Sequence, residues 1–146
     1  AVQSLALQKA QAVAAKHNQG IVLGADTLIE LEGQQLGKPQ SPEEAKEMLA
    51  KLSGKTHKVL TGVALIDAET KRTLTQVEIT EVKIGQLSQE EIDWYVESGE
   101  PFDKAGSYAI QGLAARFVEK VDGCYNNVLG LPLYRVVQML KVLSHD

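Results

Sequence analysis

A carboxylate interrupts an apolar stretch early in the chain. Asp26 follows Gly24 and Ala25 within residues 21–31, whose β-branched and aliphatic side chains predict a strand. A carboxylate there is costly to bury unless it is paired, hydrogen-bonded or bound to a metal. It could hold Mg²⁺, which binds one or two carboxylates together with substrate phosphates. It could equally be a strand-end aspartate that bonds to nearby backbone, and spacing alone leaves both readings open.

Two lysines stand next to glycines. Lys38 follows Gly37 in a predicted loop, where it could neutralise a phosphate or be a solvated surface lysine. Gly54-Lys55-Thr56 has the ending of a P-loop, but the first glycine of that motif would fall at Leu49. The order is also wrong, because a predicted helix precedes these residues and a predicted strand follows them. The sequence therefore excludes a P-loop.

Residues 101–112, PFDKAGSYAIQG, match neither the helical nor the strand period. Loops of this length with Gly, Asp, Lys and Gln more often carry function than not. Asp103 and Lys104 could form a surface ion pair of little energetic value. Gln111 could contact a base edge or a phosphate, or could bond to the backbone of its own loop.

Histidine and cysteine give no metal or nucleophile signal. His17, His57 and His145 are far apart in the sequence and show no zinc-ligand spacing, so we expect each to be structural or solvated. Cys124 is the one cysteine, which excludes an intrachain disulfide, and we expect a small core residue there.

Composition limits the class of protein. The chain has 146 residues, of which 44% are apolar and 23% charged, as in one soluble globular domain. Lys plus Arg is 15 and Asp plus Glu is 19, so the net charge of −4 disfavours nucleic-acid and anionic-membrane partners. We see no signal peptide, and no apolar stretch approaches the roughly 18 residues that span a bilayer.

Helices and strands alternate along the chain. Helices are predicted at residues 2–17, 42–53, 89–98 and from Pro132 onward, and strands at 21–31, 57–67, 74–84 and 113–121. Ser41 and Ser88 each open a capping box, and the apolar phase slips between Ile79 and Val82, which predicts a bulge. The short connection after Asp67 requires a hairpin. We therefore predict an α/β fold with a mixed β-sheet.

Several segments, in order, resemble the Maf family of nucleoside triphosphate pyrophosphatases, also called septum formation inhibitor Maf proteins. The resemblance covers nearly the whole chain and looks closest to the subgroup that acts on dTTP and UTP. Any one segment is weak, whereas the ordered set is highly specific. The segments are Lys9-Ala10, Gly24-Ala25-Asp26-Thr27, Leu36-Gly37-Lys38-Pro39, Leu52-Ser53-Gly54-Lys55-Thr56-His57, residues 102–112 and Asn127-Val128-Leu129-Gly130-Leu131-Pro132-Leu133.

The resemblance implies a fold and a reaction. The fold would be an elongated mixed sheet flanked by helices, related to the inosine triphosphate pyrophosphatase group. The reaction would be hydrolysis of dTTP, UTP and related or modified pyrimidine nucleotides to the monophosphate and pyrophosphate, dependent on Mg²⁺ or another divalent cation. The family is cytoplasmic and often dimeric, so the resemblance also implies a cytoplasmic homodimer.

The resemblance also assigns roles. Asp26 would hold the metal or orient the attacking water, while Lys9 and Lys38 would bind phosphate oxygens as catalytic residues. Such charges screen the triphosphate and stabilise the transition state. The expected substrate-binding residues are Thr27, Asp103, Lys104 and Gln111.

One family feature is missing. Family members begin with a strand and a Ser-x-Ser-Pro-Arg-Arg loop, followed by a glutamate, before the helix that starts this chain. We therefore expect residues 1–146 to form a single Maf-like domain that is incomplete at its N-terminus. The alternative is a non-catalytic nucleotide-binding or cell-division interaction module. A nucleic-acid-binding role is third, since the net charge and the few aromatics argue against it.

Overall fold

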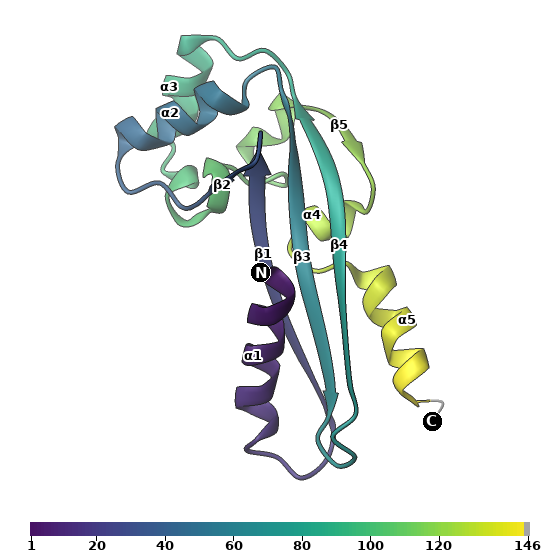
Figure 1. The fold of residues 1–146 in the computed structure, drawn as a ribbon. Helices are drawn as coiled ribbons and strands as arrows, with labels where there is room; N and C mark the ends of the chain where they lie inside the picture. Colours follow the sequence, from purple (N-terminus) through teal and green to yellow (C-terminus); the bar gives the residue numbers. More distant parts are fainter. Residues whose placement is uncertain (145–146) are drawn as a thin grey trace. The chain divides into compact units, whose positions relative to one another are not determined.

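Five strands form one sheet in the order β2-β1-β3-β4-β5 in a computed structural model of the chain, which describes residues 1–144 (Figure 1). The strands are β1 (Ile21–Leu31), β2 (Gln34–Leu36), β3 (Thr56–Asp67), β4 (Thr73–Ile84) and β5 (Val118–Asp122). The α-helices are α1 (Val2–Ala14), α2 (Pro42–Leu52), α3 (Gln89–Glu97), α4 (Tyr125–Val128) and α5 (Leu133–Ser144). Short 3₁₀ turns lie at η1 (Glu100–Asp103), η2 (Ala105–Ser107) and η3 (Leu113–Phe117).

The predicted α/β class with helices flanking the sheet is confirmed, and the sheet is antiparallel where we expected strands of both directions. β1 pairs antiparallel with β2, and β4 with β5. The chain crosses over through α2 from β2 to β3, but these two strands lie on either side of β1. The helical crossover therefore joins strands that are not neighbours and creates no parallel pair.

The chain divides into two compact units. Unit 1 holds residues 1–27, residues 60–79 and the residues from Asn126 onward, and unit 2 holds residues 28–59 and 80–125. Strands β1, β3 and β4 each contribute residues to both units.

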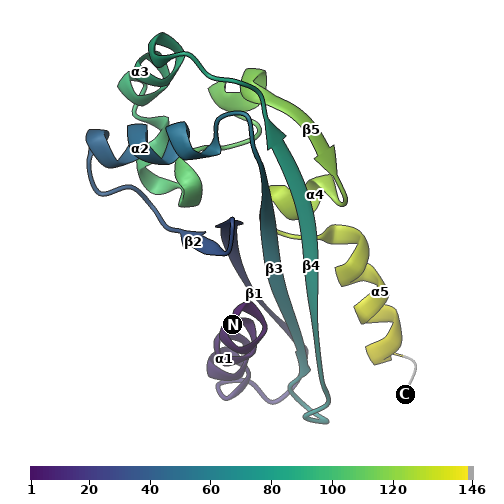
Figure 2. The same cartoon turned by 45° about the horizontal axis from the view of Figure 1, so that its top comes forward.

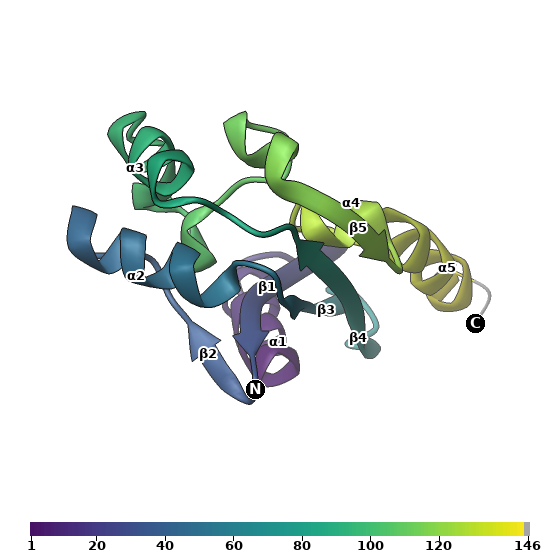
Figure 3. The same cartoon turned by 90° about the horizontal axis from the view of Figure 1, so that it is seen from above.

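In unit 1, two helices cover opposite faces of β3 (Figure 3). Successive side chains of a strand point to opposite faces, so Ala64 and Ile66 share one face while Val63 and Leu65 share the other. The first pair packs under α1 and the second under α5. Buried on both sides, β3 is a nearly continuous apolar run.

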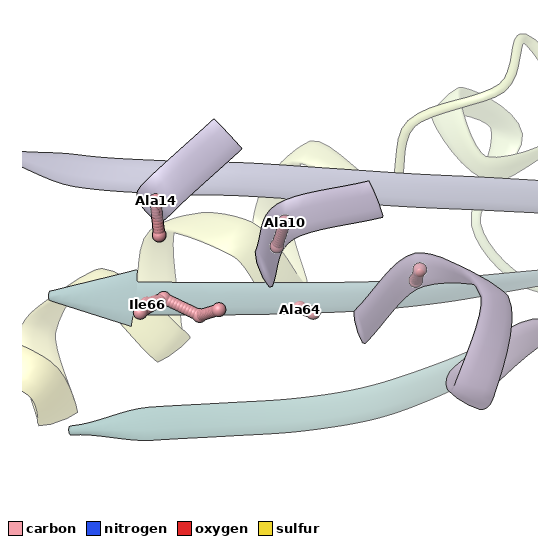
Figure 4. Packing of buried hydrophobic residues seen from close by; sticks show 5 residues of the cluster. Ala10, Ala14, Ala64 and Ile66 are labelled. Carbon is pink, nitrogen blue, oxygen red and sulfur yellow. The ribbon is translucent and has the colours of Figure 1, made fainter. Parts of the chain in front are cut away.

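Helix α1 lies very close to β1 and β3 because glycines of these strands face small residues or backbone of the helix. Apart from Val2 at its start, the buried residues of α1 are alanines, and Ala10 and Ala14 lie over Ala64 and Ile66 (Figure 4). A Cβ added to Gly24 on β1 would overlap the carbonyl oxygen of Ala6 and lie 2.9 Å from the amide nitrogen of Ala10. Gly62 on β3 is equally close to the first turn of α1, where a Cβ would overlap the backbone of Val2.

In unit 2, α2 and α3 pack side by side (Figure 2). Each helix begins at a predicted serine cap. Ser41 Oγ accepts from the Glu44 amide without the reciprocal bond of the predicted capping box, whereas Ser88 forms the complete box with Glu91. Tyr95 on α3 is fully buried and meets the Phe117 ring edge-to-face, with centroids 5.8 Å apart. Such caps and aromatic contacts fix where each helix starts and which face it buries.

Some predicted boundaries were wrong. Residues 113–117 form a 3₁₀ turn rather than the start of a strand: the buried residues Ala114 and Phe117 are three apart, as in a 3₁₀ helix, and not two. The pairing of β4 with β5 is irregular between Lys83 and Ile84. The bulge between Ile79 and Val82 lies mostly outside this pairing and stays a prediction. β2 and α4 were not predicted, being only three and four residues long. The prediction for His145 lies outside the described residues.

No helix within residues 1–144 is both long and apolar enough to cross a membrane.

We expect Gly62→Ala to destabilise the protein by about 1–3 kcal/mol, the usual cost of forcing extra atoms into a packed contact. The added methyl group has only backbone of α1 to displace. Urea unfolding followed by circular dichroism measures the change. Gly85→Ala is the matched control, since a Cβ there would lie at an ordinary 3.8 Å from the Phe117 carbonyl oxygen. Equal stability of the two variants would contradict the close-packing argument.

Candidate functional site

Lys9 and Asp26 form an ion pair within unit 1. Asp26 lies two residues beyond Gly24 on β1, so its side chain points to the face that α1 covers. Lys9 is adjacent in sequence to Ala10, which packs on that glycine. Its ammonium donates to Asp26 Oδ1 at 2.8 Å and to the carbonyl oxygen of Ala25 at 3.2 Å. The close helix contact thus brings together two of the predicted site residues.

Lys9 engages only one oxygen of the Asp26 carboxylate. The Asp26 side chain is 21% exposed, and within residues 1–144 its Oδ2 accepts no hydrogen bond. No three histidine, cysteine, aspartate or glutamate side chains of the described chain cluster as a metal site. A cation at Asp26 would therefore have one protein carboxylate, with its other positions filled by water and substrate oxygens. Mg²⁺ is bound in this way in many nucleotide enzymes, so the residues present fit it.

Thr27 faces away from Asp26 along the strand. Its hydroxyl is hydrogen-bonded to that of Thr61, with the oxygens 2.9 Å apart, and lies 3.5 Å from the Gly130 carbonyl oxygen. Thr61 is fully buried, whereas Thr27 is exposed. Sequence reasoning missed Thr61, although a threonine within the apolar run of β3 is a signal that could have found it.

In unit 2, three predicted charges act on one another. Lys104 Nζ donates to Asp103 Oδ1 at 2.9 Å, as the sequence predicts for a surface pair. The hydrogen bond from Lys104 lowers the pKa of the Asp103 carboxyl, and the positive charges of Lys104 and Lys38 lower it further. Lys38 itself is exposed, and its ammonium meets no carboxylate at salt-bridge distance in the described part of the chain. Its charge is therefore available to an anion.

Gln111 is exposed in the turn that closes the long loop. Glu100 holds the end of this turn, because its carboxylate oxygens accept from the Leu113 amide at 3.0 and 3.2 Å. The same carboxylate fills the space beside Gly112, where a Cβ would overlap it. The turn is thus fixed while the Gln111 side chain remains accessible to a ligand.

His57 and Tyr108 form a buried polar pair. His57 is 1% exposed, and its Nε2 is hydrogen-bonded to the Tyr108 hydroxyl at 2.6 Å. Burial lowers the pKa of His57 to about 4, so the imidazole is neutral at pH 7, and burial raises the pKa of Tyr108. The sequence predicted that His57 is either structural or solvated. Its burial makes it structural. The role of Tyr108 was not predicted.

Lys55 and Cys124 have no part in the candidate site. Lys55, excluded above as a P-loop lysine, pairs with Glu32 at 3.1 Å, and a helix precedes and a strand follows it. Cys124 is half-buried rather than a core residue.

The long loop contains backbone strain. Gly106 and Ser107 both have φ near +72°, a region that glycine adopts freely and serine does not. Ser107 is fully buried, and its hydroxyl donates to the sulfur of Met48 at 3.1 Å. A strained, fully buried residue in a loop indicates that the surrounding structure holds it there, which is frequent at functional sites.

The chain is similar in sequence to known proteins. The family model for Maf-like proteins matches residues 1–143. The chain is 56% identical over 145 residues to a dTTP/UTP pyrophosphatase of Bacillus cereus, an alignment that covers 99% of this chain and 75% of the relative. Proteins of the same name from Bacillus mycoides and Bacillus cytotoxicus are 54% and 55% identical over 99% and 96% of this chain, and over 75% and 72% of their own.

The lowered pKa of His57 predicts how stability changes with pH. In the unfolded chain the imidazole binds a proton near pH 6.5, whereas in the fold it does so only near pH 4. The unfolded state therefore binds more protons between these values, and stability falls as the pH falls. From pH 7 to pH 5 this group should remove about 2 kcal/mol of stability.

Urea unfolding of the wild type and His57→Gln at both pH values measures this contribution, since glutamine does not titrate. The wild type should lose about 2 kcal/mol more than the variant over this range. Parallel losses in the two proteins would show that His57 is protonated equally in the folded and unfolded chains.

Proposed function

We propose that this chain, which belongs to the Maf family, hydrolyses nucleoside triphosphates, with dTTP and UTP as substrates, to the monophosphate and pyrophosphate. The observation that carries the proposal is the Lys9–Asp26 pair, held at 2.8 Å in a chain 56% identical to a dTTP/UTP pyrophosphatase. The five-stranded α/β architecture is consistent with this family. The non-catalytic alternative is not favoured, because these relatives are named for a pyrophosphatase.

The reaction requires water to attack the α-phosphorus of a highly charged substrate. The water oxygen forms the new bond to phosphorus, the bond to the bridging oxygen breaks, and pyrophosphate leaves. Nucleotide hydrolases generally use divalent cations, and we propose Mg²⁺ with Asp26 as its protein ligand. When bound, the ion would screen phosphate charge and stabilise the charge that develops on the leaving group.

The residues of unit 1 have defined parts in this proposal. Asp26 presents the carboxylate that holds the metal or orients the attacking water. Lys9, positioned beside it, transfers its hydrogen bonds to phosphate oxygens when substrate arrives. Thr27 contributes a hydroxyl to substrate binding, and its bond to the buried Thr61 fixes where that oxygen lies.

We propose that residues of unit 2 bind the phosphates and the nucleoside of the substrate. Lys38 neutralises phosphate charge. Its exposure supports this role, as does the absence of a salt bridge to its ammonium among the described residues. Gln111 contacts the nucleotide from its exposed turn. Asp103 and Lys104 contribute to substrate binding, with Asp103 orienting the Lys104 ammonium.

The proposal also covers the domain organisation, location and partners of the protein. We propose that residues 1–146 belong to a single Maf-like domain, that the protein acts in the cytoplasm as a homodimer, and that it binds neither nucleic acid nor membrane. The net charge of −4 supports the last point, because polyanions are repelled by an acidic protein. Modified pyrimidine nucleotides are proposed as further substrates.

We expect Mg²⁺-dependent release of pyrophosphate from dTTP and UTP, and loss of this release when EDTA removes the ion. Asp26→Asn should lower kcat by at least about 100-fold, the size of effect seen when one group that stabilises transition-state charge is lost. A coupled assay of pyrophosphate gives the rate. Turnover by Asp26→Asn at the wild-type rate would exclude the proposed role of this carboxylate.

We expect Lys9→Met to lower kcat/KM for dTTP by about 10- to 100-fold, the loss of one charge-assisted hydrogen bond to phosphate. Lys16→Met is the matched control, because Lys16 is exposed just after the same helix and forms no ion pair in the described chain. The control should retain wild-type kinetics. A similar loss in both variants would point to a general charge effect rather than to a contact made by Lys9.

A further inference from the structure

The loop of residues 103–112 is tied to the segment that carries Lys38. The amide of Gly106 donates to the carbonyl oxygen of Gly37 at 3.0 Å. Gly37 directly precedes Lys38, so a shift of the loop at Gly106 pulls on the backbone beside this lysine. The positive charge of Lys38 also lowers the pKa of Asp103 in the same loop, which places the two side chains within electrostatic reach.

Two residues further along, the buried pair of His57 and Tyr108 holds the same loop to β3. The Nε2–hydroxyl distance is 2.6 Å, and the rings meet edge-to-face at 5.3 Å between centroids. Within residues 1–144, Nδ1 of His57 is buried without a hydrogen-bond partner. The bond to Tyr108 is therefore the one polar contact that this imidazole makes there, and a buried polar group strongly favours keeping its only partner.

The backbone between these two ties is constrained. Gly106 and Ser107 both take positive φ, and both are buried. A Cβ on Gly106 would lie 2.9 Å from Cδ1 of Ile29, so the turn packs closely against this side chain. The position of Tyr108 thus fixes Gly106, and Gly106 fixes Gly37.

We infer that the His57–Tyr108 hydrogen bond positions the 103–112 loop and, through Gly106 and Gly37, the Lys38 segment, in the arrangement that binds the nucleotide. The inference rests on the proposed function, in which Gln111 and Lys38 contact substrate. His57 and Tyr108 are positioning residues, because both are buried and touch no substrate.

The test uses Tyr108→Phe, which removes one hydroxyl and keeps the ring, with Tyr134→Phe as control. Tyr134 is 74% exposed on α5 and has no part in the proposed site. Hydrogen exchange is measured by mass spectrometry on peptides covering residues 101–113 and 36–40, with α1 as internal reference. The same proteins are assayed for KM and kcat with dTTP and Mg²⁺.

For Tyr108→Phe, exchange in both peptides should rise by about 3- to 10-fold, and KM for dTTP should rise by a similar factor, as expected for one buried hydrogen bond. The kcat value should change less than KM, and α1 should be unaffected. His57→Gln should retain more of the wild-type KM than His57→Leu, because the glutamine amide can donate near the place of Nε2. A general loss of stability would give no such rescue in KM.

Unchanged exchange in either peptide would overturn the inference. So would faster exchange with an unchanged KM, since the bond would then stabilise the loop without positioning it for substrate. The wild type decides the proposed function separately: if it releases no pyrophosphate from any nucleoside triphosphate, that function fails. The exchange of the two peptides still shows whether the pair holds the loop and the Lys38 segment together.

Discussion

Helix α1 and strands β1 and β3 meet almost backbone to backbone, and the geometry of the Asp26 site depends on this contact. Gly24 and Gly62 leave room for the helix, and the alanines of α1 supply a face with no large side chain. Small residues bury little apolar area each, so the contact gains stability from close dispersion packing rather than from large side chains. An added methyl group therefore displaces the helix instead of repacking beside it.

The ion pair of Lys9 and Asp26 follows from this packing and does not cause it. The Lys9 side chain is 57% exposed, and exposed pairs of this kind contribute at most about 1 kcal/mol to stability. What the packing supplies is placement. A lysine on a rigid helix needs little rearrangement to reach an anion bound near Asp26, and preorganised charge of this kind is the main source of transition-state stabilisation in phosphoryl transfer.

Local signals in the sequence predicted much of the fold. The caps at Ser41 and Ser88 and the apolar runs of β1 and β3 depend on residues close in the chain, and these elements were predicted nearly to the residue. Periodicity could not show the strained turn at Ser107 or the bond between His57 and Tyr108, because each depends on partners about 50 to 60 residues away. The pairing of Lys9 with Asp26 is similar, since no spacing rule places a helix over a strand. The resemblance to a family supplied Lys9, whereas Asp26 also stood out from the sequence as a carboxylate within an apolar strand.

On the proposed function, the charges around Lys9 in unit 1 and around Lys104 in unit 2 each suit a small, multiply charged anion. Lys9 and Lys104 each have a carboxylate partner at 2.8 and 2.9 Å, so an anion must compete with Asp26 or Asp103 for them. A single negative charge competes poorly, whereas a triphosphate that arrives with its own cation offers both the anion that lysine needs and the cation that the released carboxylate needs. A long polyanion would bring the same phosphates but would also meet the net charge of −4 within a Debye length of about 8 Å. If the proposed function holds, paired lysines on an acidic protein favour a short phosphate chain that brings its own cation.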